Sequence, residues 1–132
     1  EAEEWESALQ YFRRALEIEP NLAAAHSNLG VTLKELGRLD EALASYTQAI
    51  AVKPNYAEAH NDLGNTLREL GRLDDAEASL RQVIVLKPDL AEAHNTLGKV
   101  LLSKGHHQEG LNEKVIGVGA ICFDLKNGLS ML

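Results

Sequence analysis

A 34-residue period constrains this chain more than any other feature of its sequence. When residues 57–90 are laid over residues 23–56 without a gap, 20 of 34 positions are identical. The pattern starts a third time at Ala91-Glu92-Ala93-His94-Asn95. Self-similarity at a fixed period of this length is typical of a repeat protein, in which stacked copies of one small unit bury a continuous core.

Glycines and prolines mark the ends of two helices inside each period. The recurring residues, 34 apart, are Pro20, Pro54 and Pro88, then Gly30, Gly64 and Gly98, then Gly37, Gly71 and Gly105. Proline ends a helix because it lacks an amide hydrogen and disfavours the helical conformation of the residue before it. The last set of glycines falls where a helix C-terminus favours positive φ. We expect the residues after the prolines, Asn21, Asn55 and Asp89, to cap the next helix.

The period divides the chain into two complete repeats, 21–54 and 55–88, with partial copies on either side. Residues 1–20 match the second helix of a repeat whose first helix is missing, so we expect a fragment of a longer protein. Residues 89–116 are interpreted as a degenerate last repeat. Here the positions of Ala42, Tyr46, Ala49 and Pro54 are occupied by Gly110, Lys114, Gly117 and Cys122. The predicted repeat region therefore spans residues 1–116.

Residues 117–132 fall outside the repeat. Gly117 and Gly119 interrupt a helix, and the apolar runs on either side of Asn127-Gly128 are typical of strands joined by a tight turn. We expect an irregular, β-prone tail. Two interpretations stay open: a cap or docking segment that packs on the last repeat or on another chain, and the first part of a following domain.

Composition argues against several classes of function. The formal net charge of −7 disfavours a surface that follows the phosphates of nucleic acid. The apolar runs are shorter than the roughly 18 residues of a membrane helix, and the acidic start does not resemble a signal peptide. The lone Cys122 cannot form an internal disulfide. We therefore expect no nucleic-acid or membrane partner, and a reducing cytoplasmic compartment.

The sequence contains no constellation typical of an enzyme or a cofactor site. His26, His60 and His94 share one repeat position, but equivalent residues of stacked repeats are roughly 10 Å apart, whereas zinc ligands lie about 2 Å from one ion. We expect these histidines to fill the slot between helices. His106-His107 with Glu109 is interpreted as a solvated helix start. The prediction is a non-enzymatic chain without metal or cofactor.

The repeated residues resemble the tetratricopeptide repeat. The shared positions are Leu29-Gly30, Leu33, Gly37, Ala42, Tyr46, Ala49 and Pro54, which recur as Leu63-Gly64, Leu67, Gly71, Ala76, Leu80, Val83 and Pro88. The resemblance covers roughly residues 1–110. It implies an all-α fold, a right-handed superhelical solenoid of antiparallel helix pairs, in which the first helix of each pair lines a concave groove.

The same resemblance supplies candidate binding residues. The groove positions are the second, fifth, sixth, ninth, twelfth and thirteenth of each repeat, and their spacing puts them on one helical face. The candidate peptide-binding residues at these positions are Ser27, Asn28, Lys34, Asn61, Asn65, Arg68, Asn95 and Lys99. Asparagine offers both a donor and an acceptor to the main chain of an extended peptide. The same amides are also compatible with simple exposure to water.

Two known kinds of groove give different expectations. Chaperone-binding tetratricopeptide domains hold a C-terminal carboxylate with a clamp of Lys, Asn and Arg. At the clamp positions this chain carries Ser27, Val31, Asp62, Glu92 and Thr96, so binding of chaperone tails is not expected.

The repeats are also similar to the arm of O-linked N-acetylglucosamine transferases and to bacterial tetratricopeptide proteins. Such arms carry an asparagine ladder at the sixth position of each repeat. Here Asn28 matches that ladder, whereas Asp62 and Thr96 depart from it.

Three functions follow from these patterns. The first is a non-catalytic module that binds an extended peptide segment in the groove. The second is the substrate-recruiting arm of a larger enzyme, such as a glycosyltransferase, whose catalytic domain lies beyond Leu132. The third is self-assembly through open repeat ends or through the apolar tail. All three predict a protein or peptide partner.

Overall fold

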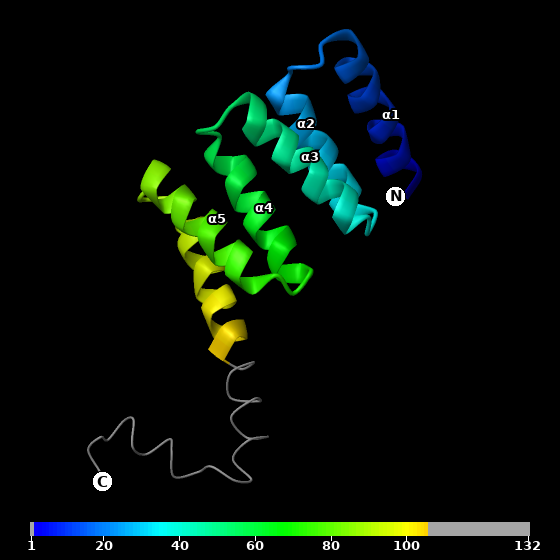
Figure 1. The fold of residues 1–132 in the computed structure, drawn as a ribbon. Coiled ribbons are helices and arrows are strands. Elements are labelled where there is room, and N and C mark those ends of the chain that lie inside the picture. The colour runs from blue at the N-terminus through cyan, green and yellow to red at the C-terminus, as the bar shows by residue number, and fades with distance from the viewer. Residues whose placement is uncertain (1, 106–132) are drawn as a thin grey trace, which may run out of the picture. The chain divides into compact units, whose positions relative to one another are not determined.

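The computed structural model describes residues 2–105, all of whose regular elements are helices (Figure 1). These are α1 (Ala2–Ile18), α2 (Ala23–Glu35), α3 (Leu39–Val52), α4 (Ala57–Glu69), α5 (Leu73–Leu86) and a helical stretch over residues 91–105. The chain divides into two compact units, Glu1–Val100 and Leu101–Leu132, and the account below concerns the first. The predicted boundary at 116 and the tail 117–132 lie outside the described residues.

The turns inside the repeats have the predicted backbone conformation. Gly37 has a φ of 78° and Gly71 a φ of 80°, as a helix end in the left-handed region requires. The next amide reaches back over each turn: Arg38 N donates to Leu33 O at 2.8 Å, and Arg72 N donates to Leu67 O at 2.9 Å. The positive φ of these glycines therefore lets the chain reverse between α2 and α3, and again between α4 and α5.

Two expectations about helix ends are wrong. The cap positions of α2 and α4 are occupied by Leu22 and Tyr56, and neither makes a side-chain cap hydrogen bond. The proline turn is one residue longer than expected, so Asn21 and Asn55 lie just outside the cap. Gly105 is helical and so does not occupy the predicted position after the last helical residue. The residues after it depart from the Gly-Arg-Leu sequence found at the other two glycines.

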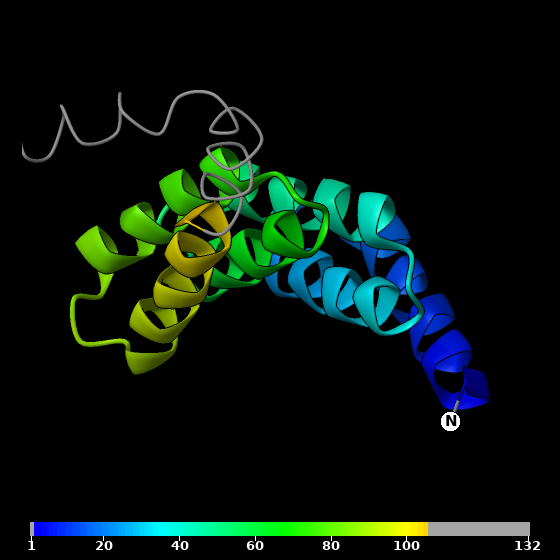
Figure 2. The ribbon, with the colours of Figure 1, turned by 90° about the horizontal axis from the view of Figure 1, so that it is seen from below.

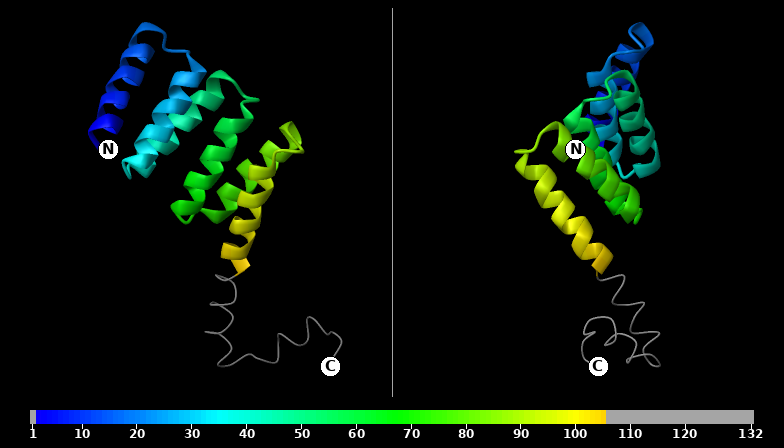
Figure 3. Two further views of the ribbon diagram at one scale, coloured as in Figure 1. Left: turned by 180° about the vertical axis from the view of Figure 1, so that it is seen from behind. Right: turned by 60° about the vertical axis from the view of Figure 1, so that its left-hand side comes forward.

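The helices of the 1–100 unit lie side by side in chain order, each next to its predecessor (Figures 1 and 3). Figure 2 shows that α2, α4 and the stretch from residue 91 form one layer, while α3 and α5 form the other. The first helix of every repeat thus lies in one layer and the second helix in the other. This two-layer arrangement confirms the predicted stack of antiparallel helix pairs.

Contact between the layers depends on glycine in the first helix of the two complete repeats. A Cβ atom added at Gly30 would lie 2.6 Å from Cε1 of Tyr46, and one at Gly64 would lie 2.7 Å from Cγ of Leu80. Both partners are fully buried. The large side chain of the second helix therefore packs directly on the backbone of the first helix.

The three repeat histidines bond to the preceding proline turn. Nε2 lies 2.9 Å from the Pro20 carbonyl oxygen in His26, 2.9 Å from Pro54 O in His60, and 2.7 Å from Pro88 O in His94. A carbonyl oxygen only accepts, so Nε2 carries the proton and donates. This bond ties each first helix to the turn that leads into it. Among residues 2–105, no helix is long and apolar enough to cross a membrane.

Replacing Gly30 by alanine should destabilise the fold by about 1–3 kcal/mol, because the new methyl group overlaps the Tyr46 ring. Urea unfolding followed by circular dichroism measures the change. The control is the same substitution in a Tyr46→Ala background, where the ring is absent and the penalty should disappear. An equal penalty in both backgrounds would show that the ring contact is not its cause.

Candidate functional site

The predicted binding residues lie on the layer formed by α2, α4 and residues 91–100. We call the side of this layer that carries the groove positions the first-helix face. Asn28, Asn95 and Lys99 are exposed, and Lys34, Asn61, Asn65 and Arg68 are half-buried. Ser27 is only 5% exposed and contributes to packing more than to the accessible surface.

Two of these residues on α4 are joined by a hydrogen bond. Arg68 Nη2 donates to Asn65 Oδ1 at 2.8 Å, and the pair lies one helical turn apart. The bond uses one of the two lone pairs of the Asn65 amide oxygen. The NH2 group of Asn65 is thereby fixed in orientation and remains available as a donor to a carbonyl oxygen.

The same turns of α4 contain polar atoms that the described residues do not satisfy. Asn61 Oδ1 and Arg68 Nε are both buried without a hydrogen-bond partner among residues 2–105. An unsatisfied buried polar atom costs about 1–3 kcal/mol, and such atoms are few in folded proteins. Asn61 and Arg68 each therefore keep one polar atom that no described residue uses.

Asp62 brings together charges from three helices. Its burial raises the pKa of the carboxyl group to about 6; Lys34 of α2 opposes the rise, and Glu92 and Glu58 add to it. Lys34, Asp62 and Glu92 come from three successive repeats and from the predicted positions twelve, six and two. Charges at groove positions of three successive repeats thus act on the pKa of one carboxyl group.

Carboxylates outnumber cations on this face. The cations are Lys34, Arg68 and Lys99, and the carboxylates are Glu35, Glu58, Asp62, Glu69 and Glu92. A hydrogen bond from Lys87 Nζ to Glu58 Oε2 at 2.8 Å lowers the pKa of Glu58 and keeps it charged. The three cations therefore do not make this face basic, and the surroundings of Asp62 are acidic.

Asp62 is the residue whose importance sequence analysis missed, because it was noted there only as a departure from an asparagine ladder. A signal was present, since Glu58 precedes it by one turn on the same helical face. Its raised pKa also depends on burial and on Glu92 from the next repeat, which a single helix pattern does not reveal. Within residues 2–105, no three His, Cys, Asp or Glu side chains are placed to hold a metal ion.

Two models of protein families together match most of the chain. A family model described as "Tetratricopeptide repeat" matches residues 27–91 and 61–114, and one described as "TPR repeat" matches residues 1–37. No curated protein matches the chain.

Several solved structures are similar to this fold. MamA is 26% identical with a TM-score of 0.73, over 87% of this chain and 68% of that one. The second TPR domain of human RPAP3, in complex with the HSP70 peptide SGPTIEEVD, is 25% identical with a TM-score of 0.70, over 73% and 80%. A mutant O-GlcNAc transferase from Thermobaculum terrenum is 29% identical with a TM-score of 0.71, over 76% of this chain and 19% of the transferase.

The family matches cover the same residues as the 34-residue period, and the helix pairs, glycine turns and close glycine contacts recur with that period. This chain belongs to the tetratricopeptide repeat family.

Proposed function

We propose that this chain is a non-catalytic interaction module that binds an extended peptide segment along the first-helix face. The observation that carries the proposal is the Arg68–Asn65 hydrogen bond, which orients a side-chain amide on that face. A donor whose orientation is already fixed loses little conformational entropy when a ligand binds. In this arrangement the Asn65 NH2 group donates to a peptide carbonyl, while the neighbouring Asn61 offers a second amide one turn away.

The charges of the face favour a neutral or basic peptide. Asp62 lies among Glu58 and Glu92, with Lys34 as the nearest opposing charge. A further carboxylate brought to this point is repelled by Asp62 and Glu92, whereas a lysine or arginine side chain is attracted to them; the charge of Glu58 is already offset by Lys87. Asn28, Asn95 and Lys99 extend the exposed polar surface to the repeats on either side of α4.

A second candidate function is substrate recruitment for an enzyme. It is favoured by the similarity to the O-GlcNAc transferase structure at 29% identity, of which this chain spans about one fifth. The binding surface and its amides are the same in both functions. The two differ in whether a catalytic domain is joined to the repeats, so the sequence of the full-length protein distinguishes them.

Removing both central amides should weaken peptide binding without unfolding the protein. In an Asn61→Ala/Asn65→Ala variant, we expect peptides selected from an unbiased array to bind at least tenfold more weakly, since each lost hydrogen bond is worth about 1 kcal/mol. Fluorescence anisotropy with the selected peptides measures the change.

The matched control removes two amides from the other layer, in a Gln48→Ala/Gln82→Ala variant. Both residues are exposed on α3 and α5. This control should bind the same peptides as the wild type does. If the two variants bind equally well, or if the control alone loses binding, the first-helix face is not the peptide site.

The HSP70 peptide SGPTIEEVD should not bind this chain at neutral pH. Its acidic end would meet Glu58, Asp62 and Glu92, and the clamp positions carry no basic residue. Anisotropy with the labelled peptide tests this, with the second TPR domain of RPAP3 as the positive control. Saturable binding in the micromolar range would contradict the assigned charge preference.

Replacing Asp62 by asparagine should stabilise the fold by about 1–3 kcal/mol at pH 7.5, because a carboxylate with a pKa of about 6 in the folded state is harder to ionise there than in the unfolded chain. For such a group the native state binds more protons, so wild-type stability falls as the pH rises from about 4 through 6. The gain should therefore be larger at pH 7.5 than at pH 5 in urea unfolding. The same gain at both pH values would exclude this origin.

A further inference from the structure

The two ends of the helix row in the 1–100 unit carry unmatched halves of a helix pair. α1 lies at one end of the row, and the segment of residues 91–100 lies at the other (Figures 1 and 3). By the 34-residue period, α1 corresponds to the second helix of a repeat and the 91–100 segment to a first helix. Among residues 2–105, neither has the partner that α2 gives to α3 and α4 gives to α5.

α1 is less covered than α3 and α5 at the positions that pack on a first helix. Tyr46 and Leu80 are fully buried, whereas Phe12, their equivalent in α1, is half-buried. Ala8 and Ala15 are also half-buried, although the equivalent alanines and valine of α3 and α5 are fully buried. The side of α1 that corresponds to the inner side of α3 and α5 is therefore partly open.

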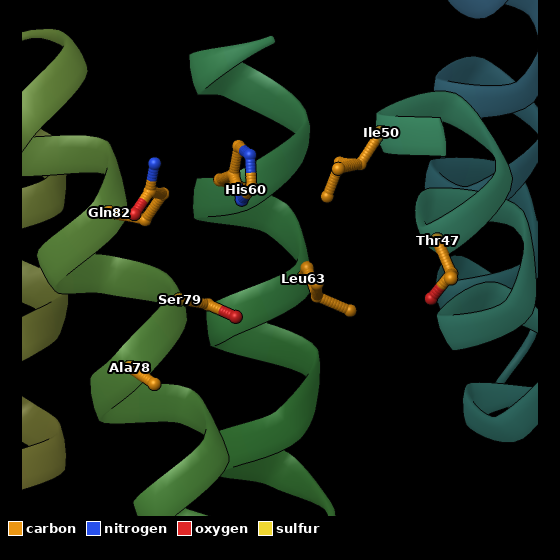
Figure 4. A pocket seen from close by; sticks show the side chains of 7 residues that line it. All are labelled: Thr47, Ile50, His60, Leu63, Ala78, Ser79 and Gln82. Atoms are coloured by element: carbon orange, nitrogen blue, oxygen red, sulfur yellow. The ribbon is translucent and has the colours of Figure 1, made fainter. Parts of the chain in front are cut away.

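Two large apolar side chains extend this open side. Tyr11 is 77% exposed and Ile18 is 70% exposed, and helical spacings of four and three residues join them through Ala15. Figure 4 shows that Ser79, the equivalent of Tyr11 in α5, points toward α4, the first helix of its own pair. The open side of α1 thus corresponds to the side on which a first helix packs. We call its apolar residues the α1 stripe: Ala8, Tyr11, Phe12, Ala15 and Ile18.

The 91–100 segment has the opposite deficiency, a packing glycine without a side chain over it. Gly98 is exposed, and within the described part of the chain nothing lies within 4 Å of a Cβ atom added there. The equivalent glycines of the two complete repeats lie under Tyr46 and Leu80. One period after Leu80 the sequence carries Lys114, so the third repeat supplies no large apolar residue at this position. His94, one turn before Gly98, is exposed, whereas the other two repeat histidines are half-buried.

We propose that the 91–100 segment of one copy packs on the α1 stripe of a second copy, with Phe12 on Gly98. This contact reproduces that of Tyr46 on Gly30 inside the chain. A second copy is the occupant because each end carries what the other lacks: a ring without a glycine beneath it, and a glycine without a ring above it. Such a joint is heterologous, so copies add head to tail and continue the stack of helix pairs.

One pair of like charges weakens this joint. Inside the second complete repeat, Lys87 Nζ at the end of α5 donates to Glu58 Oε2 at the start of α4 at 2.8 Å. In the intermolecular pair the equivalent residues are Glu19 and Glu92, both of which are exposed. Two carboxylates repel each other at this point, so we expect the association to be weak and concentration-dependent.

The first test measures the mass of this chain by sedimentation equilibrium over a concentration series. We expect the mass to rise past that of a dimer. A Gly98→Leu variant places a side chain where the Phe12 ring would lie, and should associate more weakly by about tenfold or more. The chain itself should tolerate this change, because a Cβ atom at Gly98 meets no described residue and leucine favours a helix more than glycine does.

The matched control for Gly98→Leu is Ala44→Leu. It adds the same side chain to an exposed position of α3, a helix that takes no part in the joint. This control should associate as the wild type does.

The second test distinguishes a head-to-tail joint from a symmetric one. Tyr11→Glu puts a charge on the α1 stripe from an exposed position and leaves Gly98 intact. Gly98→Leu leaves the stripe intact. At concentrations where the wild type associates, each variant alone should stay monomeric. An equimolar mixture should form a dimer and nothing larger, because only one pair of intact ends remains.

The third test reverses the like-charge contact. Glu19→Lys replaces the repulsion from Glu92 with an ion pair, and should strengthen association by roughly fivefold at low salt and by less at high salt. Glu17→Lys is the matched control, since it changes the charge equally at a position whose equivalents, Ala51 and Val85, are exposed. This control should not reproduce the gain.

Four outcomes would overturn the proposal. These are a monomer mass at every concentration, association that Gly98→Leu leaves unchanged, a mixture that assembles no better than its components, and equal effects of Glu19→Lys and Glu17→Lys. The Asn61→Ala/Asn65→Ala variant should associate as the wild type does. Failure of the peptide-groove proposal therefore leaves these tests unaffected.

Discussion

The close packing of a large side chain on a glycine backbone is the contact on which this structure depends. Gly30 under Tyr46 and Gly64 under Leu80 let the two helices of each pair approach closely. Helices of 13 or 14 residues are marginal alone, so packing between them must supply their stability. Because both complete repeats make this contact at the same position, it also fixes which side of α2 and of α4 faces inward.

This packing fixes the inward sides of the helices, whereas their outward sides can differ from one repeat to the next. On the first-helix layer they carry amides and charges, and the packing brings Lys34, Asp62 and Glu92 of three repeats near one another. On the other side, Leu63 and Ser79 are half-buried, whereas their equivalents one period earlier, Leu29 and Ser45, are buried. The same scaffold thus presents outward surfaces that differ from repeat to repeat.

The sequence predicted the scaffold well because its period is visible in single residues. Gly37 and Gly71 located two helix ends, whereas the repeat histidines, expected to fill a slot between helices, bond to the carbonyl oxygens of the preceding proline turns. The helix caps were predicted wrongly, because the hydrogen bonds of the proline turn and not side-chain propensity set where α2 and α4 begin. The raised pKa of Asp62 was out of reach, since it depends first on burial and then on charges from neighbouring repeats.

The central claim, that the first-helix face binds peptide through oriented amides, is tested most directly by side-chain amide NMR. A spectrum recorded with an array-selected peptide resolves the NH2 groups of asparagine and glutamine. The account predicts that the Asn61 and Asn65 signals shift on binding, while those of Gln48 and Gln82 on the other layer do not. Shifts of Gln48 and Gln82 with Asn61 and Asn65 unchanged would contradict it.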